Sequence, residues 1–154
     1  MNVADLMKLS QVSFGTSGVR GLVTDLSDQV VYCYTCGFLK YLEAQQELKH
    51  PGSVAVAGDY RVSTDRIMRV IGQAITDQKH TVINLGQIPT PAGAYYGVLT
   101  GVPFIMVTGS HIPADRNGIK YYHAHGEELL KADEARMLTQ SVDLPSRLFD
   151  DKGS

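Results

Sequence analysis

The chain has 154 residues, of which 44% are hydrophobic and 19% charged, a mixture that supports one folded domain. Fourteen lysines and arginines against sixteen aspartates and glutamates give a net charge of −2, which argues against a general nucleic-acid binder or a polybasic membrane-surface protein. Prolines and glycines interrupt the most apolar region, so no segment reaches the roughly 18 apolar residues of a transmembrane helix. No basic stretch followed by an apolar one opens the chain, and we expect a cytoplasmic protein.

Apolar runs of strand length alternate with runs at helical spacing, which is the pattern of an α/β domain. The glycine-punctuated segment 11–24 predicts a strand, a turn and a return strand. Further strands are expected at 53–58, 81–85, 103–107 and 119–123, and helices at about 27–47, 63–78, 92–99 and 127–141. The expected product is a single domain, a three-layer α/β/α sandwich with a mixed sheet.

The two cysteines, Cys33 and Cys36, have the C-x-x-C spacing of redox and zinc sites. They stand inside a predicted helix rather than at its start, where the helix dipole would lower a thiol pKa, and no second pair of ligands follows. We therefore expect two buried, reduced thiols.

Four of the five histidines are expected to be solvated. His123 and His125 alternate and would share a face of a strand, but no third candidate ligand lies nearby in the sequence, so they are interpreted as surface polar residues. His50 and His80 each follow a lysine at a helix-to-strand junction and are interpreted in the same way.

The first loop of interest is residues 14–21, Phe-Gly-Thr-Ser-Gly-Val-Arg-Gly. Its three glycines let backbone N–H groups turn toward an anionic ligand, and Arg20 adds a fixed cation. The segment is neither a Rossmann fingerprint nor a P-loop. A tight hairpin with Arg20 as a surface charge explains the pattern equally well, and both interpretations stay open.

The second loop, residues 58–64, lies between a predicted strand and a predicted helix, where open α/β sheets collect ligands. We expect an ion pair between Asp59 and Arg61 and a helix cap from Ser63. These residues are expected to hold the shape of the loop rather than to touch a substrate.

The third loop, residues 108–120, places Ser110 just past an apolar strand. A turn at Asn117 and Gly118 can bring Lys120 back toward this serine. The G-x-S-x-G signature of α/β-hydrolases is absent, so a serine that carries phosphate fits better than an acyl-enzyme serine. A polar loop without chemistry is the alternative.

A phosphate on Ser110 would carry about −1.5 to −2 charges near neutral pH. Arg20, His111 and Lys120 could each donate a charge-assisted hydrogen bond to it. The residues alone therefore favour an anion-carrying site made from the first and third loops.

Together the loops resemble those of the α-D-phosphohexomutase superfamily, the phosphomannomutases and phosphoglucomutases. Residues 14–21 are similar to the opening motif of the family, and residues 108–120 to its phosphoserine loop, T-A-S-H-N-P followed by N-G-x-K. Segments 58–63 and 86–91 match two further landmarks in the same order. The chain departs from the pattern at Gly109, which replaces an alanine and is expected only to loosen the backbone, and at Ile112, which replaces an asparagine amide.

The resemblance implies that residues 1–154 are the first of four family domains, the one with the phosphoserine loop, and that the other three are absent from the chain. It implies an isomerase of the phosphotransferase type that acts on hexose phosphates. Phosphorylated Ser110 would donate its phosphate to the sugar, and the resulting hexose 1,6-bisphosphate would return its other phosphate. A phosphomannomutase is expected, although the sequence leaves glucose and glucosamine phosphates open as the substrate instead. The alternative function is a non-catalytic phosphate-ester-binding module.

The resemblance also implies roles for individual residues. Ser110 is expected to carry the phosphate and, through a phosphoryl oxygen, to bind Mg²⁺ together with a loop of a missing domain. Lys120 is the expected general acid and base, while Arg20 neutralises the phosphoryl group and His111 donates a hydrogen bond near it. Thr16 and Ser17 are expected to bind substrate beside Arg20. The expected partners are hexose phosphate, hexose 1,6-bisphosphate and the other domains of the full-length enzyme, with no nucleic acid and no membrane.

Overall fold

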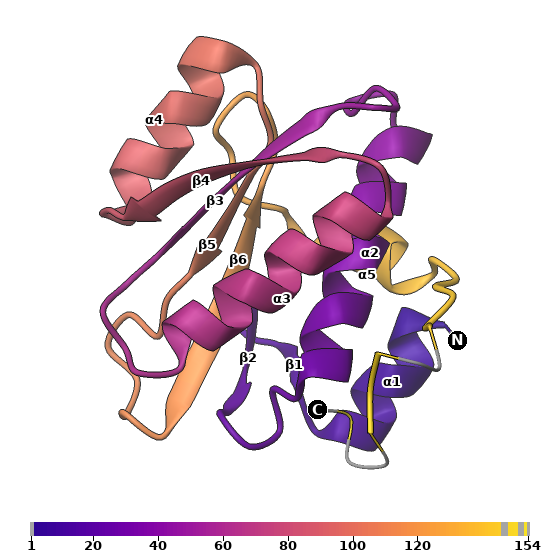
Figure 1. The fold of residues 1–154 in the computed structure, drawn as a ribbon, viewed down its shortest axis with the longest axis vertical. Helices are drawn as coiled ribbons and strands as arrows, with labels where there is room; N and C mark the ends of the chain where they lie inside the picture. The colour runs from indigo at the N-terminus through magenta and orange to yellow at the C-terminus, as the bar shows by residue number, and fades with distance from the viewer. Residues whose placement is uncertain (1, 146–147, 151–152, 154) are drawn as a thin grey trace.

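The computed structural model describes residues 2–145, 148–150 and 153. Its helices and strands alternate along most of the chain, as the sequence pattern predicts (Figure 1). In chain order the elements are α1 (Val3–Ser10), β1 (Ser13–Phe14), β2 (Val19–Leu22), α2 (Asp28–Ala44), β3 (Ser53–Gly58), α3 (Thr64–Asp77), β4 (Thr81–Gln87), α4 (Thr90–Thr100), β5 (Phe104–Val107), β6 (Arg116–Tyr122) and α5 (Lys131–Leu138).

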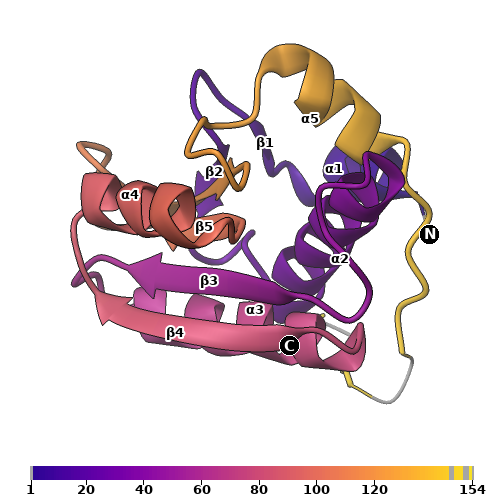
Figure 2. The same cartoon turned by 90° about the horizontal axis from the view of Figure 1, so that it is seen from above.

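The six strands form one mixed sheet in the order β1-β2-β6-β5-β3-β4. Strand β3 runs parallel to β4 and β5, whereas β6 runs antiparallel to both β5 and β2. Helices α2 and α3 cover one face, α4 covers the other, and α1 and α5 pack against α2. Figure 2 shows α3 and α4 on opposite sides of β3 and β4. The expected three-layer α/β/α sandwich with a mixed sheet is therefore confirmed.

The two central parallel strands, β3 and β5, are almost completely buried because helices cover both of their faces. Toward α2 and α3 they present Val54, Val56, Ile105 and Val107. Toward α4 they present Ala55, Ala57, Phe104 and Met106. This two-sided burial fixes the register of the sheet, since a slip by one residue would exchange the two sets.

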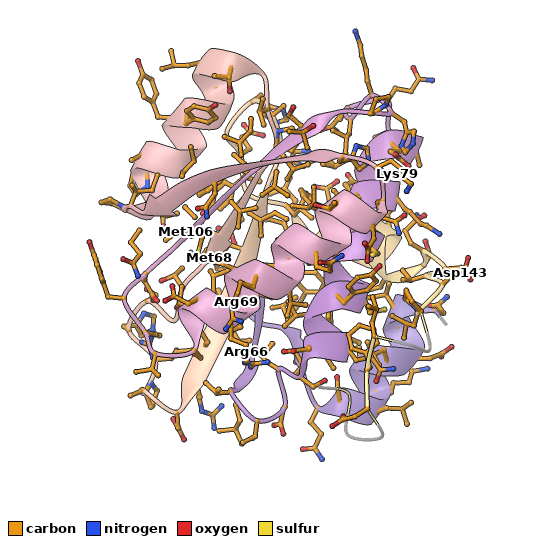
Figure 3. The ribbon with its side chains drawn as sticks, viewed as in Figure 1. Arg66, Met68, Arg69, Lys79, Met106 and Asp143 are labelled. Atoms are coloured by element: carbon orange, nitrogen blue, oxygen red, sulfur yellow. The ribbon has the colours of Figure 1, made fainter. Side chains whose placement is uncertain are left out.

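Polar contacts at the helix starts agree in part with the sequence. The Ser27 hydroxyl caps α2 by accepting from the N–H of Val30 at 3.3 Å. At the start of α3, Arg66 donates to the carbonyl of Leu26 at 2.8 Å and pairs with Asp28, which ties α3 to the beginning of α2 (Figure 3). The beginnings of α2 and α3 are thus held together by Arg66.

The expectation for the cysteines is confirmed, because both lie buried in α2 as free thiols. Burial raises the pKa of Cys33 to about 11 and that of Cys36 to about 12. Thiols with such pKa values stay protonated near neutral pH, so they act as small core side chains.

Two of the histidine expectations are wrong. His80 is only 5% exposed and His123 only 7%, whereas His50 and His125 are exposed as expected. The buried rings satisfy their nitrogens within the protein: His80 contacts Glu43, and His123 contacts Glu47 and Asp133.

The ends of the chain differ most from the expected elements. Helix α1 was not predicted; Asn2 caps it through the N–H of Ala4, and its apolar side packs on α2. Helix α5 starts at Lys131 rather than near 127. The segment before it runs back beside β6, where the N–H of Leu129 donates to the carbonyl of Tyr121 and so is not available for a helical hydrogen bond. In the described part of the chain, no helix is long and apolar enough to cross a membrane.

We predict opposite effects for two helical glycines. A Cβ at Gly93 of α4 would overlap the buried ring of Phe104, so Gly93→Ala should lower the free energy of unfolding by about 1–3 kcal/mol. A Cβ at Gly72 of α3 would meet nothing closer than 4.0 Å, so Gly72→Ala should raise it by about 0.5–1 kcal/mol. Urea unfolding of the wild type and of the two variants measures both changes. Equal unfolding midpoints for Gly93→Ala and the wild type would show that α4 does not pack closely on β5.

Candidate active site

The site lies where the parallel strands end. The segments that follow β3, β4 and β5 meet at this edge of the sheet, which is where open α/β sheets bind ligands. A pocket of about 340 Å³ opens there, lined by Gly58, Asp59, Tyr60, Gln87, Ile88, Pro89, Thr90, Met106 and Thr108. Segments 58–63, 86–91 and 108–113, which carry three of the sequence motifs, therefore border one pocket.

The Asp59 carboxylate joins two of these loops. It accepts hydrogen bonds from the Thr64 hydroxyl at 2.7 Å, the Arg61 N–H at 3.0 Å, the Gly109 N–H at 3.0 Å and the Thr108 hydroxyl at 3.0 Å. Burial alone would raise the pKa of Asp59, but these four hydrogen bonds outweigh burial and hold the pKa below its usual range. The carboxylate is therefore charged at neutral pH, and both of its oxygens accept hydrogen bonds from the protein.

The Arg61 guanidinium holds the third loop from the inside. Its Nε lies 3.4 Å from the Asp59 carboxylate, so the expected ion pair is confirmed. Its terminal nitrogens donate to backbone carbonyls of Ser110 (3.3 Å), Ile112 (2.6 Å), Pro113 (2.7 Å) and Arg116 (3.1 Å). The guanidinium thus supplies donors to a loop that has no secondary structure of its own, and both side chains shape the loop as expected.

Two details of this loop correct the sequence-based expectations. A Cβ at Gly109 would overlap Nε and Cζ of Arg61, so the glycine admits the guanidinium rather than only loosening the backbone. Ser63 occupies the N-cap position of α3, but its side chain makes no capping bond. Its hydroxyl accepts from the Asn117 amide at 2.9 Å instead, which ties the start of β6 to the second loop.

Ser110 stands exposed at the head of the loop. Its backbone has φ 53°, in the left-handed region that non-glycine residues rarely adopt and that costs of order 1–3 kcal/mol. The hydrogen bond from its N–H to the Thr108 hydroxyl, at 3.0 Å, and the bond from Arg61 to its carbonyl hold this conformation. The Ser110 hydroxyl lies 3.4 Å from Nδ1 of His111, which is also exposed.

Arg20 and Lys120 share one face of the sheet. Arg20 of β2 lies opposite Gly118 of β6, two residues from Lys120, so the two cations are diagonal neighbours. The glycine-rich first loop rests on their stems: a Cβ at Gly15 would lie 3.4 Å from Cδ of Arg20, and one at Gly18 would lie 3.0 Å from Cγ of Lys120. The first loop is therefore a tight hairpin between β1 and β2, and the same hairpin lies against Arg20 and Lys120.

Glu128 is a site residue that the sequence analysis missed. Its carboxylate accepts a hydrogen bond from the Ser17 hydroxyl at 2.6 Å and lies 3.8 Å from Nζ of Lys120. Glu128 reaches this position because its segment bridges to Tyr122 at the end of β6. The sequence placed it inside a helix, and no local signal connects it with residues more than 100 positions earlier.

The structure gathers the expected residues into two adjoining groups. Ser17 and Lys120 contact Glu128, with Arg20 on the neighbouring strand and Thr16 exposed in the first loop, whereas Ser110 and His111 lie together on the third loop. Among the described residues, no hydrogen bond or ion pair joins Ser110 to Arg20 or Lys120. Gly118 connects the groups, since it pairs with Arg20 and its carbonyl accepts from the Thr108 N–H at 2.9 Å.

The loop can supply part of a magnesium site. Mg²⁺ prefers oxygen ligands, including phosphate oxygens, and keeps several of its waters. Ser110 offers one exposed oxygen, but the lone pairs of Asp59 are already engaged by four donors. These residues fit one ligand of an octahedral ion, not a complete set.

Comparison with known proteins places this domain in one family. The family model described as "Phosphoglucomutase/phosphomannomutase, alpha/beta/alpha domain I" matches residues 11–143. The chain is 41% identical over 133 residues to a phosphomannomutase of Salmonella muenchen, covering 86% of this chain and 27% of that protein. It is 34% identical over 128 residues to a phosphoglucosamine mutase of Ruminiclostridium cellulolyticum, covering 80% and 28%.

A solved structure agrees with these matches. A phosphoglucomutase/phosphomannomutase family protein from Burkholderia thailandensis superposes with a TM-score of 0.65 at 26% identity, over 79% of this chain and 28% of that one. The domain is thus an α/β/α domain of the hexose-phosphate mutase class. The chain belongs to the phosphoglucomutase/phosphomannomutase family, in the region of its domain I, and spans about a quarter of the length of the curated relatives it matches.

The pH dependence of the loop follows from Asp59. Its folded-state pKa is depressed, so the stabilisation that it gives is present above the ordinary carboxyl pKa of about 3.9 and is lost as the pH falls through the folded-state value. The Gly109 amide donates to this carboxylate, and its NMR resonance should titrate with a midpoint below about 3.9. Asp59→Asn should abolish that titration; a midpoint at or above the ordinary value would contradict the assignment.

Proposed function

We propose that this chain is the phosphoryl-carrying domain of a phosphohexomutase, with Ser110 as the carrier. The observation that supports the proposal is the exposed serine held in a left-handed conformation by the Thr108 and Arg61 hydrogen bonds, at the carboxyl edge of the sheet. Backbone strain of this kind clusters at functional sites. The family membership supplies the reaction class, an intramolecular phosphoryl shift between the 1- and 6-positions of a hexose phosphate.

In the proposed reaction, the bond between phosphorus and the Ser110 oxygen breaks as a bond to a sugar hydroxyl oxygen forms. The proton of that hydroxyl leaves through Lys120 and returns to the Ser110 oxygen, so Lys120 serves as base and then as acid. The reverse transfer from the other position of the hexose 1,6-bisphosphate restores phosphoserine. Positioning and charge neutralisation supply most of the catalysis in such transfers.

The remaining residues have charge and positioning roles. Arg20 neutralises the phosphoryl group or the bound bisphosphate, and His111 donates a hydrogen bond beside Ser110. Thr16 and Ser17 bind the substrate next to Arg20. Magnesium, when bound, neutralises phosphoryl charge, and Ser110 contributes one phosphoryl oxygen to it. Glu128 orients Lys120 and Ser17, which it contacts directly.

The substrate that we propose is mannose phosphate. The chain is more similar to the Salmonella phosphomannomutase, at 41% identity, than to the Ruminiclostridium phosphoglucosamine mutase, at 34%. Because the matched region is about a quarter of each relative, further family domains would complete the sugar and magnesium contacts, and the chain alone should show no turnover. The relatives reported above are mutases by name, which favours a mutase over a non-catalytic phosphate-ester-binding module.

The proposal predicts one phosphorylation site. When this domain is joined to the other family domains and incubated with glucose 1,6-bisphosphate, peptide mapping should locate the phosphate on Ser110. Ser110→Ala should remove the label and most of the mutase activity, whereas Ser141→Ala, far from the cationic loops, should change neither. Phosphate mapped to Ser17 or Ser63, with Ser110→Ala fully active, would show that another loop carries the phosphoryl group.

A further inference from the structure

A cluster of metal-ligating side chains lies at the end of β6 that is far from Ser110. One ligand atom each from Glu47, His123 and His125 falls within 4.8 Å of the other two. His123 and His125 come just after the last residue of β6, whereas Ser110 belongs to the loop that leads into its first residue. The seven-residue strand therefore separates the histidines from Ser110 by about 20 Å. The third ligand comes from a distant part of the sequence, which is why the alternating histidines alone did not reveal a site.

Backbone hydrogen bonds hold all three residues in place. Just beyond the end of helix α2, Gln46 has φ 62°, and the N–H of Glu47 donates to the carbonyl of Leu42 at 2.9 Å, which turns Glu47 toward β6. The N–H of His123 donates to the carbonyl of Glu127 at 2.8 Å, and the N–H of Gly126 donates to the carbonyl of His123 at 2.9 Å. The tight turn stacks the two imidazole rings, with centroids 4.9 Å apart and an interplanar angle of 14°.

His123 has the environment of a metal-bound imidazole. Its Nδ1 lies 2.7 Å from the Glu47 carboxylate, and its Nε2 lies 3.4 Å from the Asp133 carboxylate. A metal-ligating histidine typically donates its other ring N–H to a carboxylate, and Asp133 is placed to accept it. The Tyr41 hydroxyl, at 2.7 Å, and the Leu130 N–H, at 2.9 Å, orient Asp133 in turn.

Carboxylates surround both imidazoles. His123 lies between the carboxylates of Glu47 and Asp133. His125 adds a contact with the Glu127 carboxylate, at 3.2 Å. Three carboxylates therefore contact two imidazoles, and this negative excess favours a divalent cation.

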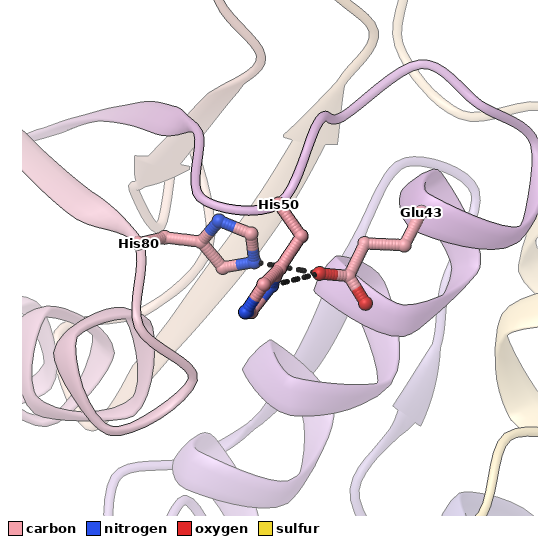
Figure 4. Close-up of side chains that lie close together, drawn as sticks. All are labelled: Glu43, His50 and His80. Atoms are coloured by element: carbon pink, nitrogen blue, oxygen red, sulfur yellow. Dashed lines mark hydrogen bonds and ion pairs between the residues drawn. The ribbon is translucent and has the colours of Figure 1, made fainter.

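A second cluster of the same composition provides an internal comparison. Figure 4 shows His50 and His80 beside the Glu43 carboxylate, at 2.7 and 3.0 Å. Here Nδ1 of the buried His80 accepts a hydrogen bond from the Gly52 N–H at 3.0 Å. A neutral His80 must therefore keep its proton on Nε2, where it donates to Glu43, and the lone pair that a metal would need is absent. This cluster is complete as a hydrogen-bond network.

We propose that Glu47, His123 and His125 form a zinc-type binding site, which leaves a fourth coordination position to water. Two imidazole nitrogens and one carboxylate oxygen suit Zn²⁺, whereas Mg²⁺ prefers oxygen ligands alone. The cation binds Nδ1 of His123 in the tautomer that carries its proton on Nε2, where that proton is donated to Asp133. His125, whose side chain is 58% exposed, turns from Glu127 toward the cation.

The geometry requires only small movements. Tetrahedral zinc with bonds of about 2.0–2.1 Å separates neighbouring ligand atoms by about 3.3 Å. The Glu47 and His123 atoms must open from 2.7 Å, and the exposed His125 must approach them. Both Glu47, 30% exposed, and His125 can adjust at the surface without disturbing the core.

The test is zinc binding to the 154-residue chain, purified without a histidine tag and titrated calorimetrically with ZnCl₂ and, in parallel, with MgCl₂. Cobalt(II) serves as a spectroscopic probe, since tetrahedral coordination gives intense visible absorption. The variants are His125→Ala and Glu47→Gln, with His50→Ala as the matched control: His50 is an equally exposed histidine, 55% against 58%, in the comparison cluster. Thermal unfolding without metal checks that all variants fold.

We expect one Zn²⁺ per chain, no competition from Mg²⁺, and binding at least tenfold weaker in His125→Ala and Glu47→Gln but unchanged in His50→Ala. Zinc should also raise the unfolding temperature of the wild type and of His50→Ala only. No zinc binding by the wild type would overturn the proposal. Binding that survives in His125→Ala and Glu47→Gln, or that is lost in His50→Ala, would do the same. None of these readouts depends on mutase activity or on the role of Ser110.

Discussion

The shape of the active-site edge depends on one partly buried ion pair, between Asp59 and Arg61. The carboxylate gathers donors from the second and third loops, and the guanidinium gathers carbonyls from the third. Among the described residues, no hydrogen bond or ion pair joins either group to Arg20 or Lys120. Their joint effect is to replace the missing secondary structure between β5 and β6 with side-chain hydrogen bonds, which leaves Ser110 exposed in a conformation that an isolated peptide would avoid.

The antiparallel strand β6 connects the two ends of the molecule. Its residues 116–119 pair with β2, Lys120 follows them beside Glu128, and His123 comes directly after the end of the strand. Chemistry at the two ends is separated because charge is arranged differently at each. At one end, Arg20 and Lys120 lie on neighbouring strands next to Glu128, adjoining the loop of Ser110; at the other end, carboxylates gather around His123 in the site proposed for a cation.

The sequence predicts the sandwich and the loops correctly because both depend on local patterns. Strand β3 is a continuous run of small and β-branched residues, and the glycines of the first loop mark the turn between β1 and β2. The turn expected at Asn117 and Gly118 is wrong, because both residues lie inside β6. What it misses depends on contacts between distant segments. Glu128 joins Ser17 across 111 positions and Glu47 joins His123 across 76, and no periodicity records such pairs. The sequence does not predict the burial of His80 and His123 for the same reason, since segments remote in sequence enclose each ring.

The most direct measurement is amide hydrogen exchange over residues 108–116 in Arg61→Lys, compared with the wild type and with Arg69→Lys on the exposed side of α3. Lysine keeps the charge but cannot reach several carbonyls at once, because it lacks the planar fork of arginine. The amides of Gly109, Ser110 and Ile112 should lose protection in Arg61→Lys alone, while β3 and β5 keep theirs. Equal protection of these three amides in all three proteins would contradict the central role of the guanidinium.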